Sequence, residues 1–238
     1  MVFGANFDFS QFLNAKEFFD YSIPRVMQAE PSTIVTAESQ TEQKPRIPDY
    51  LVAFSTHSES YCVGCVDMVN STKMSAVIPE SKLSGYYEIF LNSMSKIIGR
   101  YGGKVIKNVG DCLLYYFPGE DKKQGFLNCL DCGLAMIEAQ SIICQQLETK
   151  GLPCLSYRVS ADFGNVIIMN TSDSASIDMI GPPVNMCTKI NHSAKRNEFV
   201  IGGDFFENVK KFEDFKFAPV NSCNIGFKLS YPVYKVLA

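Results

Sequence analysis

Two aspartates lie inside strongly apolar stretches of this 238-residue sequence. Asp67 is part of Tyr61–Lys73 (YCVGCVDMVNSTK), and Asp111 is part of Lys104–Phe117 (KVIKNVGDCLLYYF). A carboxylate in apolar surroundings is costly unless a cation meets it. Two such carboxylates placed side by side would also repel each other, and a divalent metal ion between them would remove that repulsion. The pair therefore predicts metal-assisted chemistry on a phosphate group.

The segment after Asp67 adds a second feature that suits phosphate. It consists of Val69, Asn70, Ser71 and Thr72 and leads toward a helix, with Ser71 or Thr72 as the expected N-cap. Backbone N–H groups at a helix start bind phosphate oxygens. With two metal ions held by the aspartates, one ion would lower the pKa of an attacking hydroxyl group and the other would neutralise a leaving polyphosphate. Alternatively, one aspartate caps a helix, the other occupies a hairpin turn, and neither has a chemical role.

The spacing of apolar residues predicts the elements that would position these side chains. Strands are expected over Tyr61–Val69, Lys104–Val109, Cys112–Phe117, Tyr157–Met169 with a break at Gly164, Phe199–Ile201 and Pro232–Leu237. Helices are expected over Pro79–Tyr101, Gln124–Leu147 and Val184–Ala194. A tight turn at Asn108–Asp111 would join the second and third strands. The order βαββαβ predicts an α+β, ferredoxin-like sheet core with extra strands and helices, helices on one face, and the first strand beside the hairpin.

The sequence divides into two parts of different composition. Residues 1–48 are expected to hold a short amphipathic helix within 7–28 and then a flexible linker, which is rich in Glu, Ser, Thr, Gln and Pro and has little to bury. The helix could pack on the following domain, or it could serve dimerisation or regulation. Residues 49–238 are expected to form the functional domain.

Composition excludes several classes of protein. The formal net charge of −3 provides no basic surface for nucleic acid or anionic lipid. No apolar run reaches the ~20 residues that a membrane-spanning helix needs, and the N-terminus lacks the basic region of a secretory signal. We therefore expect a cytoplasmic protein with no nucleic-acid partner and no membrane span.

Nine cysteines are scattered along the chain and do not form the pattern of a disulfide framework. Two Cys-x-x-Cys pairs raise the alternative of a zinc site. However, Cys62 and Cys65 fall on opposite faces of the expected strand, and Cys129 and Cys132 fall on the apolar stripe of a helix. Buried, reduced thiols are therefore the preferred interpretation, and they suit a cytoplasmic location.

Four segments resemble, in order and in register, the catalytic domain of class III nucleotidyl cyclases. They are Cys65–Thr72 (CVDMVNST), Tyr101–Phe117 (YGGKVIKNVGDCLLYYF), Arg158–Val166 (RVSADFGNV) and Ile177–Asn185 (IDMIGPPVN). These segments are similar to the family's first metal-binding strand, its hairpin, its central strand and the stretch that ends in a ribose-contacting asparagine. The resemblance extends from about Ser60 to Val236. It implies a nucleotide cyclase fold for residues 49–238 and conversion of ATP to 3′,5′-cyclic AMP and pyrophosphate by attack of the ribose 3′-hydroxyl on the α-phosphate.

The resemblance implies a metal and phosphate site with defined members. Asp67 and Asp111, assisted by the carbonyl group of Met68, would bind two Mg²⁺ or Mn²⁺ ions. The segment Val69–Thr72 would contact phosphate oxygens, and Lys228 would contact the terminal phosphate.

The resemblance also implies which groups recognise the nucleoside. Lys107 and Asp178 match the residues that read the purine, and a donor beside an acceptor complements N1 and N6 of adenine, so ATP is the implied substrate. Asn185 would orient the ribose so that its 3′-hydroxyl faces the α-phosphorus. Taken alone, Lys107 could be a solvated surface cation, Asp178 a turn residue and Asn185 a helix cap.

One position departs from the family pattern. The family has an arginine that stabilises the pentavalent phosphorane one helical turn after Asn185, and this chain has Lys189 there. Lysine keeps the positive charge but lacks the planar fork that binds two oxygens. The departure favours one alternative, a catalytically weak module that binds ATP and metal for regulation. A cyclic-dinucleotide synthase is a second alternative, but its usual Gly-Gly-acidic-acidic-Phe turn is absent.

Class III cyclases build each site at a head-to-tail dimer interface. Metal ligands come from one subunit, and the purine and ribose contacts come from the other. Because this chain carries both sets of residues, the resemblance implies a homodimer with two equivalent sites. Arg158 and His192 are expected to have no catalytic role.

Overall fold

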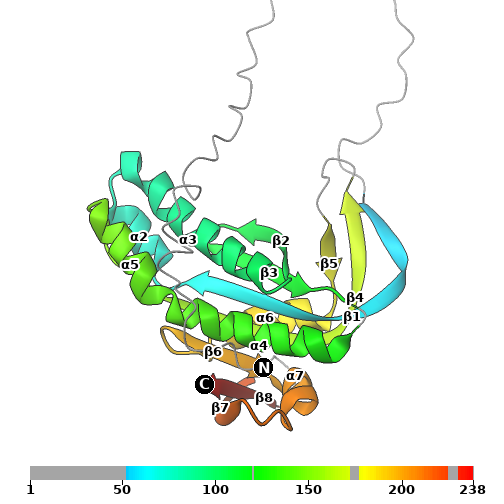
Figure 1. The fold of residues 1–238 in the computed structure, drawn as a ribbon. Coiled ribbons are helices and arrows are strands. Elements are labelled where there is room, and N and C mark those ends of the chain that lie inside the picture. The colour runs from blue at the N-terminus through cyan, green and yellow to red at the C-terminus, as the bar shows by residue number, and fades with distance from the viewer. Residues whose placement is uncertain (1–51, 120, 172–176, 225–229, 238) are drawn as a thin grey trace, which may run out of the picture.

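The computed structural model describes residues 52–119, 121–171, 177–224 and 230–237 (Figure 1). The expected helix within 7–28, the linker after it and Lys228 lie outside these residues. The strands are β1 (Val52–Met68), β2 (Lys104–Val109), β3 (Cys112–Phe117), β4 (Tyr157–Thr171), β5 (Asp178–Ile180), β6 (Glu198–Gly202), β7 (Lys216–Asn224) and β8 (Ser230–Leu237). The helices are α2 (Ser71–Val77), α3 (Glu80–Arg100), α4 (Lys122–Glu138), α5 (Gln140–Thr149), α6 (Pro182–Asn191) and α7 (Gly203–Val209).

The described strands form one mixed sheet in which β1 lies between β3 and β4. The strand order is β2-β3-β1-β4-β6-β8-β7, and β5 pairs with β4 off this path. β1 is antiparallel to both of its neighbours, whereas β4 and β6 are parallel. The expected βαββαβ core is therefore present as β1, α3, β2, β3, the helical segment α4–α5, and β4, which confirms the α+β fold.

Side chains on β1 alternate between two cores on opposite faces of the sheet. Val66 and Met68 pack into the main core, which the helices α3, α4 and α5 cover. Cys65 belongs to a second core that includes Cys187 of α6. The helices therefore do not all lie on one face as expected, because α6 packs on the opposite one. Asp67 continues the alternation of Cys65, so its side chain lies on the α6 face.

Helix α3 confirms an expected element and its end. Tyr86, Phe90 and Met94 recur at helical spacing and are fully buried in the main core. Just after the helix, Gly102 adopts a φ of 77°, a backbone conformation that costs glycine little. The expected helix over Pro79–Tyr101 therefore differs from α3 by one residue at each end.

The helix expected over Gln124–Leu147 is instead two helices, α4 and α5, which are bent by 41°. At the bend the side-chain amide of Gln140 donates to the carbonyl group of Leu155 (2.9 Å). The sequence did not reveal the break because the apolar pattern continues through it, and Ile143 packs in the same core as α4. Among the described residues no single helix is long and apolar enough to cross a membrane. The bent pair α4–α5 taken together has the length and the composition of such a span.

Other elements differ from the expected ranges. β1 begins at Val52 rather than at Tyr61, and β4 runs without a break because Gly164 pairs with Tyr61 in the sheet. Three elements were not expected, namely β5, α7 and β7, whereas α2 is the helix expected after Asp67. Helix α2 has no buried residue, so no apolar stripe marks it in the sequence.

The cysteines correct one expectation. Cys144 and Cys154 are joined by a disulfide bond, whereas reduced thiols were expected throughout. Their Cα atoms are 4.6 Å apart because the chain turns back after α5, and spacing in the sequence does not show this. Cys62, Cys65, Cys112, Cys129, Cys132 and Cys187 are free. Within the described ranges no group of three or more His, Cys, Asp or Glu residues is arranged to hold a metal ion. The zinc alternative gains no support.

A buried carboxylate ties the C-terminal part of the sheet to β4. Asp162 is 1% exposed. It accepts hydrogen bonds from the N–H groups of Phe163 (2.9 Å) and Phe205 (3.3 Å) and from the hydroxyl group of Tyr231 (2.9 Å). Burial raises its pKa to about 7 in spite of these bonds. Below pH 7 the Asp162 carboxyl group is therefore mostly protonated in the folded protein.

Asp162 should make the stability of the protein fall as the pH rises. Its folded pKa of about 7 lies above the value of ~3.9 for an unfolded chain, so between these values the folded state binds more protons. We expect the free energy of unfolding to decrease by up to about 4 kcal/mol from pH 4 to pH 7 through this group, and to level off above pH 7. Asp162→Asn should remove this slope, and urea unfolding of both proteins across the range measures it. Equal slopes would contradict the assignment.

Candidate active site

Strand pairing brings Asp67 and Asp111 together at one end of β1. Asp67 is opposite Cys112 in the β1–β3 ladder, and Asp111 precedes Cys112 in the turn between β2 and β3. Directly opposed residues have Cα atoms ~4.5–5.5 Å apart, so the Cα atoms of the two aspartates are at most about 9 Å apart. Gly110, with a φ of 64°, makes the tight turn that sets this approach. The expected convergence is present.

The electrostatics around Asp67 match a site for cations. Burial and then the charge of Asp111 raise the pKa of Asp67, while Arg158 and His192 act in the opposite direction. Arg158 is the cross-strand partner of Asp67 on β4. The net effect is a carboxylate whose charge is incompletely compensated by the protein. Mg²⁺ is commonly held by one or two carboxylates with the remaining oxygens from substrate phosphate and water, so the pair fits such an ion.

The backbone after Asp67 is only partly available for phosphate. The side chain of Met68 is buried in the main core, so only its carbonyl group could face a ligand. The N–H group of Val69 already donates to the carbonyl of Ser156 (2.8 Å), which argues against Val69 as a phosphate donor. The N-cap of α2 is Asn70 with a φ of 61°, not Ser71 or Thr72 as expected. Asn70, Ser71 and Thr72 thus form the N-cap and the first turn of α2, where backbone N–H groups lack intrahelical partners.

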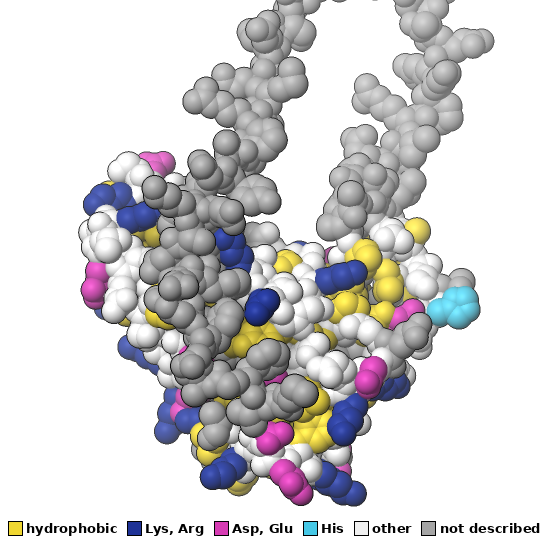
Figure 2. Space-filling view, in the orientation of Figure 1, with side chains coloured by type: hydrophobic (Ala, Val, Ile, Leu, Met, Phe, Trp, Pro, Cys, Tyr) yellow, Lys and Arg dark blue, Asp and Glu magenta, His cyan; other side chains and the backbone are white. Residues whose placement is uncertain are grey.

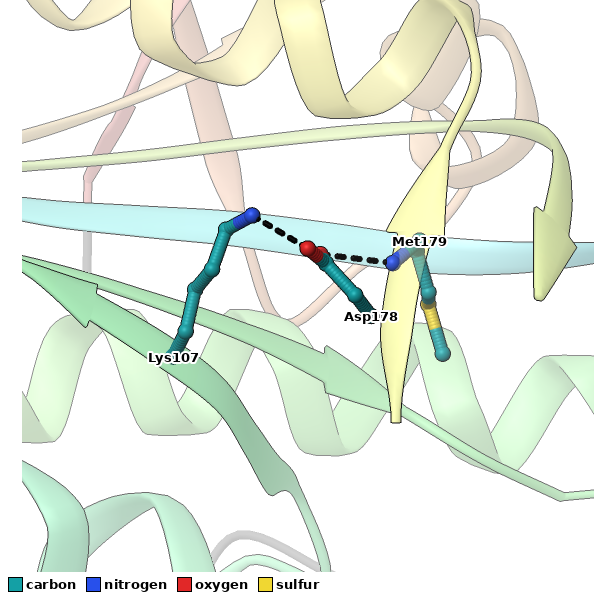
Figure 3. A network of polar contacts seen from close by, with 3 residues as sticks. All are labelled: Lys107, Asp178 and Met179. Atoms are coloured by element: carbon teal, nitrogen blue, oxygen red, sulfur yellow. Dashed lines mark hydrogen bonds and ion pairs between the residues drawn. The ribbon is translucent and has the colours of Figure 1, made fainter. Parts of the chain in front are cut away.

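Lys107 and Asp178 form an ion pair across two elements that are distant in sequence. Lys107 on β2 donates to Asp178 on β5 at 2.5 Å, and Asp178 also accepts from the N–H group of Met179 at 2.8 Å (Figure 3). Figure 3 shows the two side chains pointing toward each other. The structure therefore brings together the two residues expected to read the base. Lys107 lies ~10 Å back along the hairpin from the turn that carries Asp111.

Helix α6 carries Asn185 and Lys189 one turn apart, and both residues are exposed. The helix begins at Pro182, with Gly181 as its N-cap, so Asn185 lies within the helix and is not its cap. Gly181 has a φ of 157°, and a Cβ atom there would meet the carbonyl oxygen of Asn165 at 2.5 Å. This close approach fixes the start of α6 on β4.

Two basic residues near the aspartates were not expected to matter. Arg158 was expected to stabilise the fold or to form a salt bridge, and His192 was assigned no role. Each of them acts to lower the pKa of Asp67. The signal that locates Arg158 is the register of β1 against β4, which pairs it with Asp67. No periodicity in a single strand reveals that register. His192 follows the last residue of α6, and its place depends on how that helix packs.

Comparison with protein families gives a match over most of the chain. The model of the adenylate and guanylate cyclase catalytic domain matches residues 54–236. The chain is 27% identical over 150 residues to the photoactivated adenylate cyclase subunit beta-like protein ST- of Euglena gracilis, which covers 56% of this chain and 16% of that protein. It is 24% identical over 181 residues to cytidylate cyclase of Staphylococcus aureus, covering 70% and 41% of the two chains. The chain thus spans less than half of the length of each of these relatives.

Solved structures share the fold at low sequence identity. The crystal structure of the adenylyl cyclase CyaB from P. aeruginosa superposes with a TM-score of 0.69 at 21% identity, covering 76% of this chain and 96% of that one. The guanylyl cyclase Cya2 gives a TM-score of 0.67 at 18% identity, covering 76% and 92%. The names of these proteins refer to different nucleotides, so the likeness alone does not select a base.

Binding of Mn²⁺ tests the role of the two aspartates without a nucleotide. We expect millimolar Mn²⁺ to raise the unfolding temperature of the wild-type protein and to have no effect on Asp67→Asn. Without metal, Asp67→Asn should unfold at a higher temperature than wild type, because burial and Asp111 disfavour the charge of Asp67. Thermal unfolding with and without Mn²⁺ measures both effects.

Asp131→Asn is the matched control for this measurement. Asp131 on α4 is also a partly buried aspartate whose pKa is raised, first by burial and then by Asp214. Its substitution should leave the shift caused by Mn²⁺ unchanged. An equal Mn²⁺ shift in wild type and in Asp67→Asn would show that the metal binds elsewhere.

Proposed function

Because the chain belongs to the adenylate and guanylate cyclase catalytic domain family, we propose that it is an adenylate cyclase that converts ATP to 3′,5′-cyclic AMP and pyrophosphate. The observation that carries this proposal is the approach of Asp67 and Asp111 at the end of β1. The ion pair between Lys107 and Asp178 supports it further. The aspartates suit a polyphosphate with its metal ions, and the ion pair suits the edge of a base.

The proposed reaction is an in-line displacement at the α-phosphorus. The ribose 3′-oxygen loses its proton to solvent and forms the new P–O bond, and the bond to the leaving pyrophosphate breaks with its electron pair on the pyrophosphate oxygen. Two bound Mg²⁺ or Mn²⁺ ions would activate the hydroxyl group and neutralise the leaving group. Asp67, Asp111 and the carbonyl of Met68 would hold these ions. The N–H groups at the start of α2 would bind phosphate oxygens, and Lys228 would contact the terminal phosphate.

The exposed face of α6 would act on the ribose and the reacting phosphate. Asn185 would orient the ribose, and Lys189 would face the negative charge that develops on the phosphorane. Lysine offers a point charge where arginine offers two parallel donors. The chain should therefore turn over more slowly than it would with arginine at this position.

Replacing Lys189 by arginine tests this role. Loss of a charge stabiliser costs ~10² to 10³ in rate, and a lysine keeps part of that effect, so we expect Lys189→Arg to raise kcat by ~10-fold. Cyclic AMP formation with Mn²⁺ as the metal measures the change. Lys210→Arg is the control, because Lys210 pairs with Glu207 on α7, which carries none of the proposed catalytic residues. No gain from Lys189→Arg would contradict a role in charge stabilisation.

The same assay separates the two alternatives. A protein that binds ATP and Mn²⁺ but forms no product with either residue at 189 would be a regulatory binding module. A product with the mass of a cyclic dinucleotide would identify a synthase. A large gain in cyclic AMP formation from Lys189→Arg supports an attenuated enzyme over the binding module, and cyclic AMP as the single product excludes the synthase.

Lys107 and Asp178 are proposed to select the base. Lys107 would donate to N1 of adenine, and Asp178 would accept from the N6 amino group. Guanine presents the reverse order, with a donor at N1 and an acceptor at O6. Cytosine presents the adenine-like order at N3 and N4, which matters because one relative is named as a cytidylate cyclase. The order of donor and acceptor alone therefore does not separate ATP from CTP.

Substitution of Asp178 tests base selection. We expect Asp178→Ala to lower kcat/KM for ATP by at least about tenfold through loss of a charge-assisted hydrogen bond, and to narrow the preference for ATP over GTP. Rates with ATP, GTP and CTP measure the preference. Lys235→Ala is the control, since Lys235 forms a similarly exposed ion pair with Glu198. An unchanged preference in Asp178→Ala would show that the base lies elsewhere.

A homodimer is proposed to complete each site. Exposed apolar side chains gather where β5 meets the end of β4, as Figure 2 shows. They include Phe54, Ile167, Ile177 and Ile180. Such a patch is typical of an interaction surface, and a second copy of the chain would cover it in a symmetric pair. Each site would then combine the aspartates of one chain with the base-reading and α6 residues of the other.

A further inference from the structure

Two polar side chains are fully buried between α6 and the sheet. Ser160 on β4 is 0% exposed, and Asn191 at the end of α6 is 1% exposed. Buried polar groups destabilise a protein unless hydrogen bonds satisfy them. Their neighbours in this core are apolar or thiol side chains such as Cys187. Two apolar residues could fill the same space. What Ser160 and Asn191 add to this core is therefore their hydrogen bonds.

Ser160 and Asn191 connect three elements through hydrogen bonds. The hydroxyl group of Ser160 donates to the carbonyl of Cys187 on α6 at 2.7 Å. The side-chain amide of Asn191 donates to the carbonyl of Arg158 on β4 and to the hydroxyl oxygen of Ser160, both at 3.1 Å. The same amide lies 3.4 Å from the carbonyl oxygen of Cys65 on β1. The hydroxyl oxygen of Ser160 lies at the same distance, 3.4 Å, from that carbonyl oxygen. Both side chains therefore flank Cys65, and the pairing of Ser160 with Cys65 in the β1–β4 ladder continues the connection to β1.

The residues that these hydrogen bonds join are close in sequence or in the sheet to the proposed site residues of both α6 and β1. On α6, Cys187 lies midway between Asn185 and Lys189, and Asn191 follows Lys189 by two positions. On the sheet, Ser160 pairs with Cys65, and the next pair along the same face is Arg158 with Asp67. The same two side chains therefore hold the helix with the proposed ribose and phosphate contacts against the strand with the proposed metal ligand.

We propose that Ser160 and Asn191 are positioning residues that link α6 to the metal-binding end of β1, so that each chain couples the two active sites of the dimer. This inference rests on the proposed function. In the proposed dimer, α6 of a chain serves one site and β1 of the same chain serves the other. A displacement of α6 at one site then acts on Asp67 at the other through Asn191 and Ser160. Such coupling is reciprocal, because it is a free-energy difference between two linked binding events.

A mixed dimer with one working site separates the two roles of the link. One chain carries Asp67→Asn, so it supplies only α6 to the working site. Its partner carries Asn185→Ala with Lys189→Ala, so it supplies only the metal ligands to that site. We expect Ser160→Ala in the chain that supplies α6 to lower kcat by at least about tenfold with little change in KM for ATP, because misplacement of ~1 Å has effects of this size. We expect Ser160→Ala in the partner chain to raise the Mn²⁺ concentration needed for half-maximal rate.

Asn191→Ala provides a second variant, and Ser93→Ala provides the matched control. Ser93 on α3 is likewise a fully buried serine, and its hydroxyl group has no hydrogen-bond partner among the described residues. Ser93→Ala should leave kcat and the Mn²⁺ dependence unchanged in either chain. Unfolding temperatures show whether each variant is folded, and Ser160→Ala removes only one oxygen atom.

The possible results are distinguishable. Loss of rate only when the chain that supplies α6 is changed would overturn the coupling between sites. No effect in either chain would overturn the positioning role as well. Wild-type protein that forms no cyclic nucleotide would instead contradict the proposed function on which the inference rests.

Discussion

The repulsion between Asp67 and Asp111 is the constraint around which the rest of the structure is arranged. Antiparallel pairing of β1 with β3 places them near each other, and burial increases the cost of the charge on Asp67. Arg158 and His192 offset part of that cost without cancelling it. A protein that needed only stability would replace these groups by apolar residues of similar volume. Two carboxylates at the end of a strand, beside a two-residue turn and with incompletely compensated charge, fit a site for divalent cations.

The two faces of the sheet divide the work of stability and function. Tyr86, Phe90 and Met94 belong to the larger core under α3, α4 and α5, which holds the sheet in place. The opposite face carries α6, the smaller core around Cys187 and the side chain of Asp67. Because successive residues of β1 point to opposite faces, a single strand contributes to both. A shift of its register by one residue would turn Asp67 into the main core, so the apolar residues of that core also fix the site.

Local signals in the sequence predicted the elements that depend on local interactions. The strands β2 and β3 and the turn at Gly110 were found because apolar segments flank a turn signal, and α3 was found from its apolar spacing. The break between α4 and α5 was missed because tertiary packing imposes it. The start of α2 was placed one or two residues too late, because the helix buries no residue that would mark it. The approach of Lys107 to Asp178 and the pairing of Arg158 with Asp67 depend on register and on the curvature of the sheet. Residue type alone does not encode these, and the resemblance to known cyclases supplied only the first pair.

The ion pair between Lys107 and Asp178 suits recognition better than it suits stability. Their side chains are 44% and 20% exposed, and an ion pair with such access to water contributes at most about 1 kcal/mol. A base that offers a donor and an acceptor can therefore replace the bond between the two side chains at small cost. The hydrogen bond from Met179 to Asp178 keeps the carboxylate oriented while this happens. Holding both groups in place before the base arrives reduces the entropy that binding must overcome. In the proposed function, the pair would therefore select a base by the order of its donors and acceptors.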